Sequence, residues 1–275
     1  MTLSMTTADT LDAPATIARA FVSARQSASA LGSYPGRAPG DMVAAYAVQD
    51  QALALWPARP AGWKVGRIAD DLAAHLGDSR LAGPVFDAQI VRADGAPVMV
   101  PVIVGGFAAV EAEFIYRIGQ DADPAITDYD AGRVLGLVEG LYFGIEIAGS
   151  PLSTINDLGP TVVASDFGNN YGLIIGGPVP GWRDLPNTEL VCETRIGGTP
   201  VGAGNASGVL GGPAGALAWL AGHLARRGRP LTAGQWITTG AVTGIHRIGP
   251  DQDAEVRFRG LGDIHLSTVA AAPAR

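Results

Sequence analysis

Two glutamates, Glu111 and Glu113, lie two residues apart in the segment Val110–Tyr116, and this spacing carries the clearest chemistry in the sequence. The β-branched and aromatic residues of the segment predict a strand, in which residues two apart point to the same face. Two buried carboxylates would repel each other and lose hydration. A hard cation such as Mg²⁺, Mn²⁺ or Ca²⁺ would offset that charge. From these residues alone, a solvated strand face is the alternative, because glutamate is rarely fully buried.

Glu146 is a third acid in an apolar setting, beside Phe143, Ile145 and Ile147. An unpaired buried charge is costly, so its carboxylate is expected either to pair with a cation or to bind a metal. Three carboxylates and waters suit a site of the Mg²⁺ type, which keeps positions open for a substrate. The residues alone leave open whether Glu146 is a metal ligand or a salt-bridge partner.

Lys64 stands between Trp63 and Val65, with a glycine on either side of the three. Apolar neighbours predict a lowered pKa, which would make the amine useful as an acid-base group or as a substrate anchor. The alternative is a surface lysine whose aliphatic stem packs on apolar residues while its ammonium stays in water.

Two further polar segments follow runs that resemble strands. Asp166–Asn170 is a polar cluster, for which an Asx-type turn is the ordinary explanation. Thr238–Ala241 could offer backbone N–H groups and a hydroxyl to a carboxylate, or it could be a simple turn. The four histidines have no metal-ligand spacing and are expected to be structural or exposed; they are His75, His223, His246 and His265.

The composition is that of an ordinary globular protein of one large domain, or of a main domain with an appendage. Of 275 residues, 47% are hydrophobic and only 16% are charged. The 38 glycines and 19 prolines favour many turns and short strands over a helical bundle. A net charge of -7 without a basic cluster argues against nucleic acid as a partner.

Cysteine usage and the N-terminus bear on where the protein works. Cys192 is the single cysteine, so neither an internal disulfide nor a cysteine zinc site is expected, and it is predicted to be a buried apolar residue in a strand. Residues 1–14 lack the basic and apolar regions of a signal peptide. No apolar stretch reaches the ~20 residues needed to span a bilayer. We therefore expect a cytoplasmic protein with no membrane partner.

The front of the chain predicts helices, and the remainder predicts short strands. Residues 11–31 fit an amphipathic helix, and Asp41 is expected to cap a second helix that ends at Leu55. Residues 90–92 and 98–100 predict a hairpin around Asp94-Gly95, since Asp-Gly favours a type I′ turn.

Further strands are expected at 110–116, 141–147, 171–175, 190–196, 199–201, 236–238, 254–258 and 264–267. Asp128 or Asp130 is expected to cap a helix that runs through 134–138, and another helix is expected at 211–227, before Gly228. The predicted fold class is therefore α+β. We divide the chain into an N-terminal, mostly helical segment at 1–80 and a β-rich domain at 81–275.

Taken in order, several short motifs resemble the fumarylacetoacetate hydrolase superfamily, and more closely its 2-keto-4-pentenoate hydratase and 4-oxalocrotonate decarboxylase branch. The matching segments span most of the chain and are Ala45–Gln49, Gly62–Gly66, Val110–Glu113, Gly144–Ile147, Val209–Pro213, Leu217–Leu220, Thr239-Gly240 and Phe258–Gly262. No single motif is decisive, whereas the ordered set is specific.

The resemblance implies a mixed β fold, similar to a barrel or roll, and a divalent metal, Mg²⁺ or Mn²⁺, held by Glu111, Glu113 and Glu146. It also implies a 2-oxo acid that chelates the metal through its carboxylate and its 2-oxygen. The residues had already indicated a hard cation at the same strand. Together the two arguments favour a metal site over a solvated strand face.

The expected reaction is addition of water to a 2-hydroxy-2,4-dienoate (2-oxo-enoate), which gives a 4-hydroxy-2-oxo acid in the meta-cleavage catabolism of aromatic compounds. Residues 81–275 would then form the catalytic domain. By resemblance, the catalytic residues are Lys64, Asp166 and Asn170, and the substrate contacts are Lys64, Asn170, Thr239 and Gly240.

Other activities of the superfamily stay open. Decarboxylation of a 2-oxo-3-enedioate (4-oxalocrotonate) would use the same metal and dienolate. Hydrolysis of a C–C bond normally needs a histidine base near the front of the site, and His75 lacks the surrounding motif. A non-catalytic partner subunit is the remaining alternative. A homo-oligomer, which could also associate with a paralogous decarboxylase or hydratase, is expected from the resemblance. Phe167 stands where relatives often carry Asn, so the resemblance does not fix the substrate.

Overall fold

Two β-sheets form the body of the computed structural model, which describes residues 14–274. The first sheet contains, in spatial order, β2 (Arg80–Phe86), β1 (Pro60–Arg67), β10 (Trp236–Thr238), β5 (Phe107–Ile118), β6 (Val138–Ser150), β7 (Asn170–Pro178) and β3 (Ile90–Arg92), and β11 (His246–Arg247) also pairs with β5. The second sheet contains β4 (Val98–Val102), β13 (Gly262–Ala270), β12 (Asp253–Phe258), β8 (Val191–Ile196) and β9 (Thr199–Asn205).

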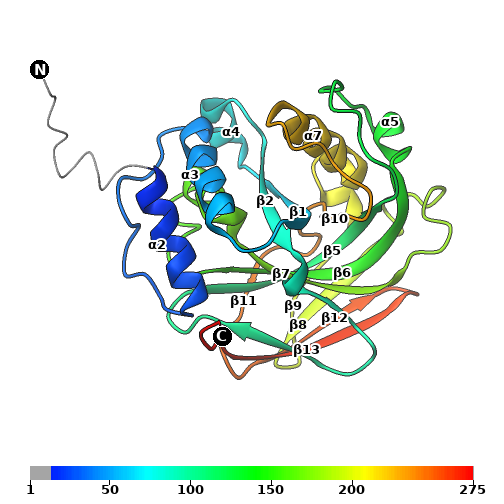
Figure 1. Ribbon diagram of the computed structural model, residues 1–275. Coiled ribbons are helices and arrows are strands. Elements are labelled where there is room, and N and C mark those ends of the chain that lie inside the picture. The colour runs from blue at the N-terminus through cyan, green and yellow to red at the C-terminus, as the bar shows by residue number, and fades with distance from the viewer. Residues whose placement is uncertain (1–13, 275) are drawn as a thin grey trace, which may run out of the picture.

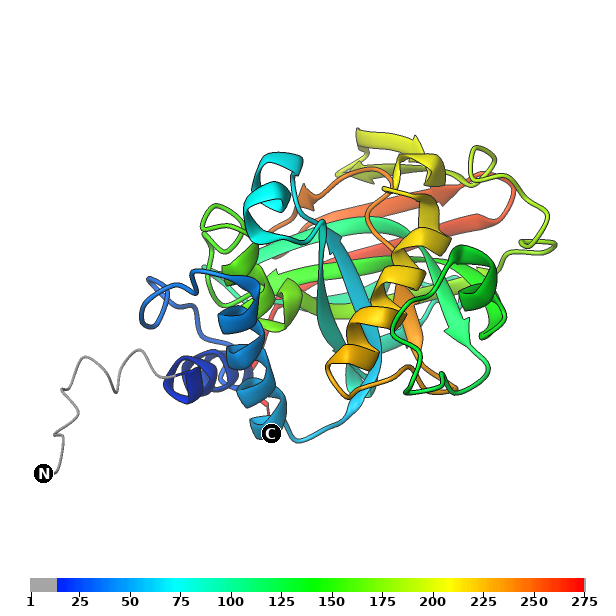
Figure 2. The same ribbon diagram turned by 90° about the horizontal axis from the view of Figure 1, so that it is seen from above.

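The helices lie on one side of the first sheet and the second sheet lies on the other (Figure 1). They are α2 (Pro14–Gln26), α3 (Met42–Leu55), α4 (Asp70–Leu76), α5 (Ala131–Leu135), α6 (Pro160–Ser165) and α7 (Gly212–Arg226), with short 3₁₀ turns η1 (Asp87–Gln89), η2 (Phe167–Asn169) and η3 (Ala206–Gly208). Figure 2 looks down on this helical layer and shows α7 crossing in front of the strands. The predicted α+β class is confirmed.

The core between the sheets explains why β5 reads as an apolar strand. Phe114 of β5, Phe143 of β6 and Phe258 of β12 are all buried. The Phe258 ring lies 5.7 Å from that of Phe114 and 4.9 Å from that of Phe143. Because helices cover the opposite face of the sheet, β5 is buried on both faces, and such strands are nearly continuous in apolar residues. Any acid on β5 is therefore removed from water.

The front helices confirm the expectation from the sequence. Asp41 caps α3, since its Oδ1 accepts a hydrogen bond of 2.8 Å from the Ala44 N–H. The helix ends at Leu55, as predicted. Helix α2 occupies the central part of the predicted helix at 11–31, of which residues 11–13 lie outside the described residues.

The predicted hairpin at 90–100 is wrong. Strand β3 pairs in parallel with β7 of the first sheet, whereas β4 pairs in parallel with β13 of the second sheet. The local turn signal is real, because Gly95 has a φ of 95° and Asp94 accepts a bond from the Ala96 N–H. The turn, however, carries the chain from one sheet to the other. Distant partner strands, which a local motif cannot reveal, decide the pairing.

The helix predicted to follow Asp128 or Asp130 is present as α5, but it ends at Leu135 rather than at 138. Asp130 caps α5 by accepting a 2.7 Å bond from the Arg133 N–H, and the chain already enters β6 at Val138. The division into 1–80 and 81–275 stays a prediction. Strand β1 of the first part lies between β2 and β10 of the second part in one sheet.

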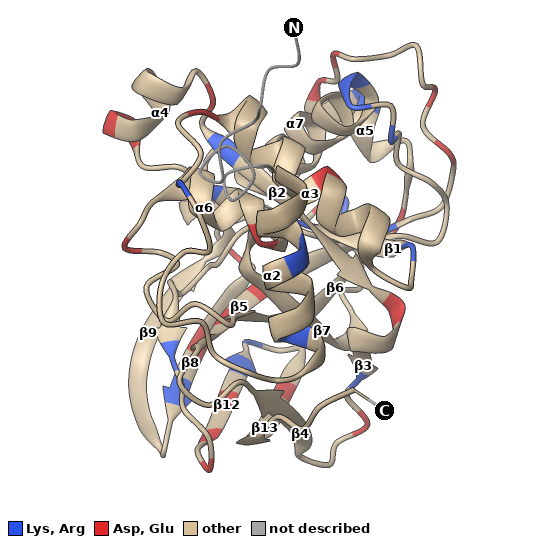
Figure 3. Ribbon diagram, turned by 60° about the vertical axis from the view of Figure 1, so that its left-hand side comes forward, with Lys and Arg blue, Asp and Glu red and all other residues tan. Residues whose placement is uncertain are grey.

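The surface gives little guidance about partners. Basic and acidic positions are interspersed along the ribbon (Figure 3). No helix within residues 14–274 is both long and apolar enough to cross a membrane. Cys192 is buried in β8, as predicted.

The aromatic contact between the sheets is expected to carry much of the stability. Replacing Phe258 by Ala removes the ring that packs on both Phe114 and Phe143, and should lower the free energy of unfolding by about 3–5 kcal/mol. Urea unfolding measures this. Met99→Ala in the same sheet is the control, because Met99 is 57% exposed and its loss should change stability by about 0.5 kcal/mol or less. Equal losses in the two variants would contradict this account of the core.

Candidate metal centre and active site

Three carboxylates converge in the first sheet. Glu111 and Glu113 lie on β5, and Glu146 lies on β6 directly opposite Glu111 in the strand register. Their residues are 4%, 0% and 0% exposed. One carboxylate oxygen from each lies within 4.8 Å of the others. The alternating geometry predicted for 110–116 is thus present, and the solvated strand face is excluded by the burial.

Hydrogen-bond donors hold two of the three acids, Glu113 and Glu146. Glu113 Oε2 accepts bonds from the N–H groups of Thr239 (2.7 Å) and Gly240 (2.8 Å). Glu146 accepts from Asn170 Nδ2 (3.1 Å) and Thr238 Oγ1 (3.0 Å).

Two oxygens have no such donor. Within the described part of the chain, Glu111 Oε1 and Glu113 Oε1 are buried without a hydrogen-bond partner. A buried carboxylate oxygen without a partner is costly. Oxygen atoms gathered in this way are the ligands that hard divalent cations prefer. The three residues therefore fit a divalent metal ion.

The pKa shifts of the acids also favour a divalent cation at this site. Burial raises the pKa of Glu111 from its ordinary 4.5 to about 7, against the opposing effect of Lys64. Burial, together with the charges of Glu146 and Glu111, holds the pKa of Glu113 well above its usual range. The site therefore binds protons readily as long as it lacks a further positive charge. A divalent cation would supply that charge.

Lys64 is the only lysine in the chain, and it lies beside these acids. It is 4% exposed, with Nζ 3.2 Å from Glu146 Oε1 and donating a 3.1 Å bond to Asn169 Oδ1. Burial alone would lower its pKa, but the charges of Glu146, Glu111 and Glu113 together raise it. The predicted fall in pKa is therefore wrong, because the apolar neighbours in sequence did not reveal the acids that surround the amine in space. Lys64 is a cation and a proton donor here.

A cavity of about 400 Å³ opens beside Lys64 and Glu111. Its wall is mixed, with polar groups near the acids and apolar or cationic groups elsewhere. The lining includes Asn156, Asn169, Thr239 and Gly240, the apolar residues Leu72, Val163, Val209, Leu210 and Ile245, and the arginines Arg67 and Arg80. Its volume suits a small ligand.

The turn η2 places two amides against the charged groups. Phe167, Gly168 and Asn169 follow one another in the left-handed region, with φ of 52°, 62° and 54°. As a result, the Asn169 side chain reaches Lys64 and that of Asn170 reaches Glu146. The Phe167 ring is buried in an aromatic cluster with Trp56 and Phe86, so it does not line the cavity.

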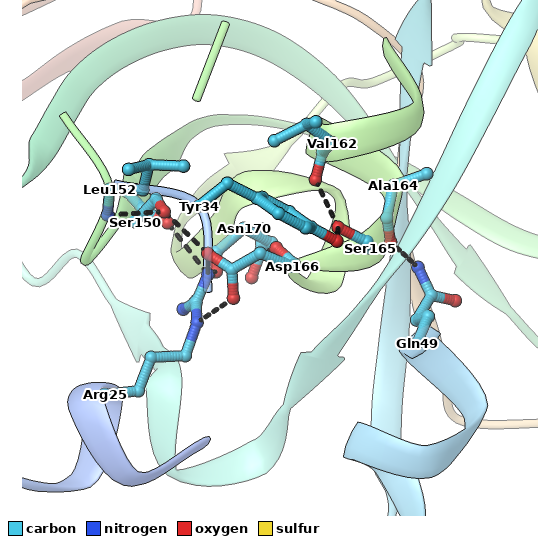
Figure 4. Close-up of polar contacts among 11 residues, drawn as sticks. Arg25, Tyr34, Gln49, Ser150, Leu152, Val162, Ala164, Ser165, Asp166 and Asn170 are labelled. Carbon is cyan, nitrogen blue, oxygen red and sulfur yellow. Dashed lines mark hydrogen bonds and ion pairs between the residues drawn. The ribbon is translucent and has the colours of Figure 1, made fainter. Parts of the chain in front are cut away.

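Asp166, predicted to be catalytic, lies behind the site. Its Oδ1 accepts a 2.6 Å bond from Arg25 Nε, and its Oδ2 accepts a 2.6 Å bond from Ser150 Oγ (Figure 4). It does not line the cavity. Because the carboxylate is fully engaged, the geometry gives it no access to a substrate proton.

Thr239 and Gly240 line the cavity, but their donors are already used. Both N–H groups bind Glu113, and Thr239 Oγ1 donates to the Phe114 carbonyl at 2.8 Å. They orient a carboxylate of the protein, whereas the sequence suggested that they would bind one of the substrate.

The sequence did not mark Asn169, Thr238 or Arg25 individually as residues of the site. Asn169 stands next to the selected Asn170, and only the left-handed turn decides which amide faces Lys64. Thr238 was within a segment that we singled out. Arg25 lies more than a hundred residues from its partners, and no local pattern marks it.

No family model matches the chain. The 2-keto-4-pentenoate hydratase 1 of Dechloromonas aromatica strain RCB is 29% identical over 227 residues, which are 82% of this chain and 84% of that relative. Two Pseudomonas 4-oxalocrotonate decarboxylases match over little more than a third of the chain.

Solved structures extend the match to the fold. The 4-oxalocrotonate decarboxylase of Pseudomonas putida G7, complexed with magnesium and adipate, has a TM-score of 0.78 at 22% identity, covering 93% of this chain and 97% of that one. The fumarylpyruvate hydrolase of Pseudomonas aeruginosa, in complex with Mn²⁺ and pyruvate, has a TM-score of 0.55 at 16% identity, covering 78% of this chain and 91% of that one. The chain is thus similar in sequence to 2-keto-4-pentenoate hydratases and shares its fold with these solved structures. The fumarylacetoacetate hydrolase fold is thereby confirmed, and the acid triad with its neighbours supports a divalent metal.

The buried acids predict an unusual pH dependence in metal-free protein. The pKa of Glu111 rises from 4.5 to about 7 on folding, so the folded state keeps this proton where the unfolded chain has released it. The associated stability is fully present below the unfolded pKa and is lost as the pH rises through the folded pKa. Melting temperatures in EDTA between about pH 5 and pH 8 should therefore fall more steeply in wild type than in Glu111→Gln.

Excess Mg²⁺ or Mn²⁺ should restore the lost stability at the upper end of this range, because the ion binds the deprotonated acids. Parallel pH profiles for wild type and Glu111→Gln, or no response to either ion, would contradict this description of the centre.

Proposed function

We propose that the protein is a divalent-metal-dependent hydro-lyase that adds water to a 2-hydroxy-2,4-dienoate and yields a 4-hydroxy-2-oxo acid, as a 2-keto-4-pentenoate hydratase does. The observation that carries this proposal is the buried set of three glutamates beside Lys64, with two carboxylate oxygens that lack a hydrogen-bond partner and with Glu111 lining a small cavity. Relatives with hydratase names that span about four fifths of the chain support the class of substrate.

Glu111, Glu113 and Glu146 would hold Mg²⁺ or Mn²⁺. When bound there, the ion supplies Lewis-acid polarisation of the carboxylate and 2-oxygen of the 2-oxo acid. Thr239 and Gly240 keep Glu113 oriented through their N–H groups, and Asn170 does the same for Glu146. These hydrogen bonds fix the orientation of the two acids. Among the described residues, Glu111 Oε1 and Glu113 Oε1 still lack a hydrogen-bond partner.

Lys64 supplies positive charge and a proton at the cavity wall. When water adds to C4 of the conjugated 2-oxo acid, electrons move toward the 2-oxygen, and the ammonium stabilises the negative charge that develops there. Nζ can then donate a proton to C3, which yields the 2-oxo product, and the proton that the added water releases returns the amine to its charged form. Asn156 and Asn169 present amide groups beside Lys64 that can orient the water. Proton transfer by Asp166 is not part of this proposal.

A cytoplasmic location, a homo-oligomeric state and association with a paralogous decarboxylase or hydratase belong to the same proposal, supported by the resemblance alone. Hydrolysis of a C–C bond has less support, since the described residues that line the cavity include no histidine.

Purified protein with Mg²⁺ or Mn²⁺ should consume 2-hydroxypenta-2,4-dienoate, followed as loss of the dienoate absorbance. Lys64→Met should lower kcat by about 10²–10⁴-fold, because it removes both the charge and the proton donor. Glu113→Gln should abolish the metal-dependent activity. Glu139→Gln is the matched control, since Glu139 is an exposed acid on β6, and it should behave as wild type.

Metal-dependent activity retained in Glu113→Gln would contradict the assigned ligands. Wild-type protein that binds Mn²⁺ but leaves both the dienoate and 2-oxo-3-hexenedioate unchanged would favour a non-catalytic partner subunit.

Arg80 favours a second candidate, decarboxylation of a 2-oxo-3-enedioate. Arg80 lines the cavity, and no carboxylate among the described residues lies within ion-pair distance of its guanidinium. That group instead donates to the Leu210 carbonyl and, at 3.5 Å, to Ser79 Oγ. A guanidinium in the cavity wall that forms no direct ion pair suits a second carboxylate on the substrate.

If the substrate is a diacid, Arg80→Gln should raise the KM for 2-oxo-3-hexenedioate by about tenfold or more, with little change for the monocarboxylic dienoate. Release of CO₂ and loss of absorbance measure the two reactions. Arg67→Gln is the control, because Arg67 also lines the cavity but is paired with Asp70 at 3.0 Å. Equal effects of Arg80→Gln on the two substrates would contradict a carboxylate-binding role.

A further inference from the structure

Arg25, near the end of α2, is one of the few buried charged residues outside the acid cluster. It is 6% exposed, and all three of its guanidinium nitrogens donate hydrogen bonds. Nε and Nη2 bind the two Asp166 oxygens at 2.6 and 2.9 Å, and Nη1 and Nη2 donate to the carbonyls of Asn170 and Gly149, each at 3.0 Å (Figure 4). Figure 3 views α2 in front of β6 and β7, the two strands to which these carbonyls belong.

Arg25 joins both ends of the turn that carries Asn169. Asp166 precedes η2 and Asn170 follows it, and the three residues between them are all left-handed. Left-handed backbone is unfavourable for Phe167, because its Cβ atom approaches the following carbonyl, whereas asparagine tolerates this region better. Such a conformation persists only where surrounding contacts fix it. Arg25 provides these contacts at both ends of the turn.

The same turn is tied to the charged groups of the candidate active site. Asn169 Oδ1 accepts the bond from Lys64, and its Nδ2 donates to Asn156 Oδ1 at 3.0 Å. Asn170 Nδ2 donates to Glu146 Oε1 at 3.1 Å. Arg25 on α2 therefore binds the same turn whose asparagine side chains bind Lys64 and Glu146.

The turn packs closely against β2 and against the side chain of Lys64. A Cβ atom built on Gly83 of β2 would lie 2.0 Å from the Phe167 carbonyl oxygen, so the turn lies directly on the strand next to β1. A Cβ atom on Gly168 would lie 3.2 Å from Lys64 Cδ. A shift of the turn would consequently move the stem of Lys64 as well as its Nζ partner.

We propose that Arg25 is a positioning residue of the active site, which holds η2 in the conformation that orients Lys64 and Glu146. Helix α2 thereby contributes to the site without touching the substrate. Only the activity readout of this inference rests on the proposed hydratase function. Its other readouts concern metal affinity and the environment of Lys64.

The experiment compares Arg25→Met with Arg227→Met. Arg227 is the matched control, because it is also a largely buried arginine at a helix, ion-paired with Asp50 at 2.7 Å, but it joins α7 to α3. Both variants should lose stability. Only Arg25→Met should bind Mn²⁺ about tenfold or more weakly, measured without substrate by the electron paramagnetic resonance of free Mn²⁺, as is typical when the groups behind a metal ligand are removed.

Lys64 provides a second readout that a purely structural role of Arg25 would not move. Since it is the only lysine, protein labelled with ¹³C-lysine gives a single Cε resonance that reports directly on the site. This resonance should shift in Arg25→Met and stay at the wild-type position in Arg227→Met. With the dienoate, Arg25→Met should lower kcat by about tenfold and change KM less.

Asp166→Asn is the second variant, for the case in which Arg25→Met does not fold. It keeps the shape of the side chain while it weakens the ion pair, and it should change Mn²⁺ affinity and the Lys64 resonance in the same direction. A folded Arg25 or Asp166 variant with wild-type Mn²⁺ affinity and an unshifted Lys64 resonance would overturn the proposal. Wild-type protein that is inactive on the dienoate would remove the proposed function while these two readouts still decide the role of Arg25.

Discussion

An excess of buried negative charge is the constraint on which this structure depends. Three carboxylates converge in a sheet that is covered on both faces, and Lys64 is the only cation within residues 14–274 that forms an ion pair with them. One ammonium cannot neutralise three carboxylates in a medium where charges are poorly screened. The raised pKa values of Glu111 and Glu113 express this imbalance as retained protons. A single divalent cation would balance the charge and would also occupy the oxygens that lack a hydrogen-bond donor.

The remaining parts of the site keep the acids in place. The chain end of β10 supplies the N–H groups that orient Glu113, and Thr238 and Asn170 orient Glu146 from two different strands. The strained turn before β7 adds the amide that binds Lys64. Helix α2 closes this arrangement through Arg25. Catalytic groups held by partners on several elements are positioned more firmly than groups on a free loop.

Much of the site could be predicted where the information was local. The two-residue spacing placed Glu111 and Glu113 on one face, and Asp41 marked the start of α3. The residues themselves marked Glu146 as a third acid that would either bind a metal or pair with a cation, and the resemblance to known enzymes favoured the metal.

What the sequence could not show depends on distant partners. The pKa of Lys64 was predicted with the wrong sign because its acids lie on other strands. The Asp-Gly hairpin failed because its two strands find parallel partners in different sheets. The sequence also could not show that Asp166 pairs with Arg25, since Arg25 lies on a helix far away in sequence.

The most direct test of the metal centre is an anomalous difference map from crystals soaked with Mn²⁺. We predict one dominant peak within about 2.6 Å of an oxygen from each of Glu111, Glu113 and Glu146. A map with no peak between these carboxylates, or with Mn²⁺ bound only elsewhere, would contradict the account.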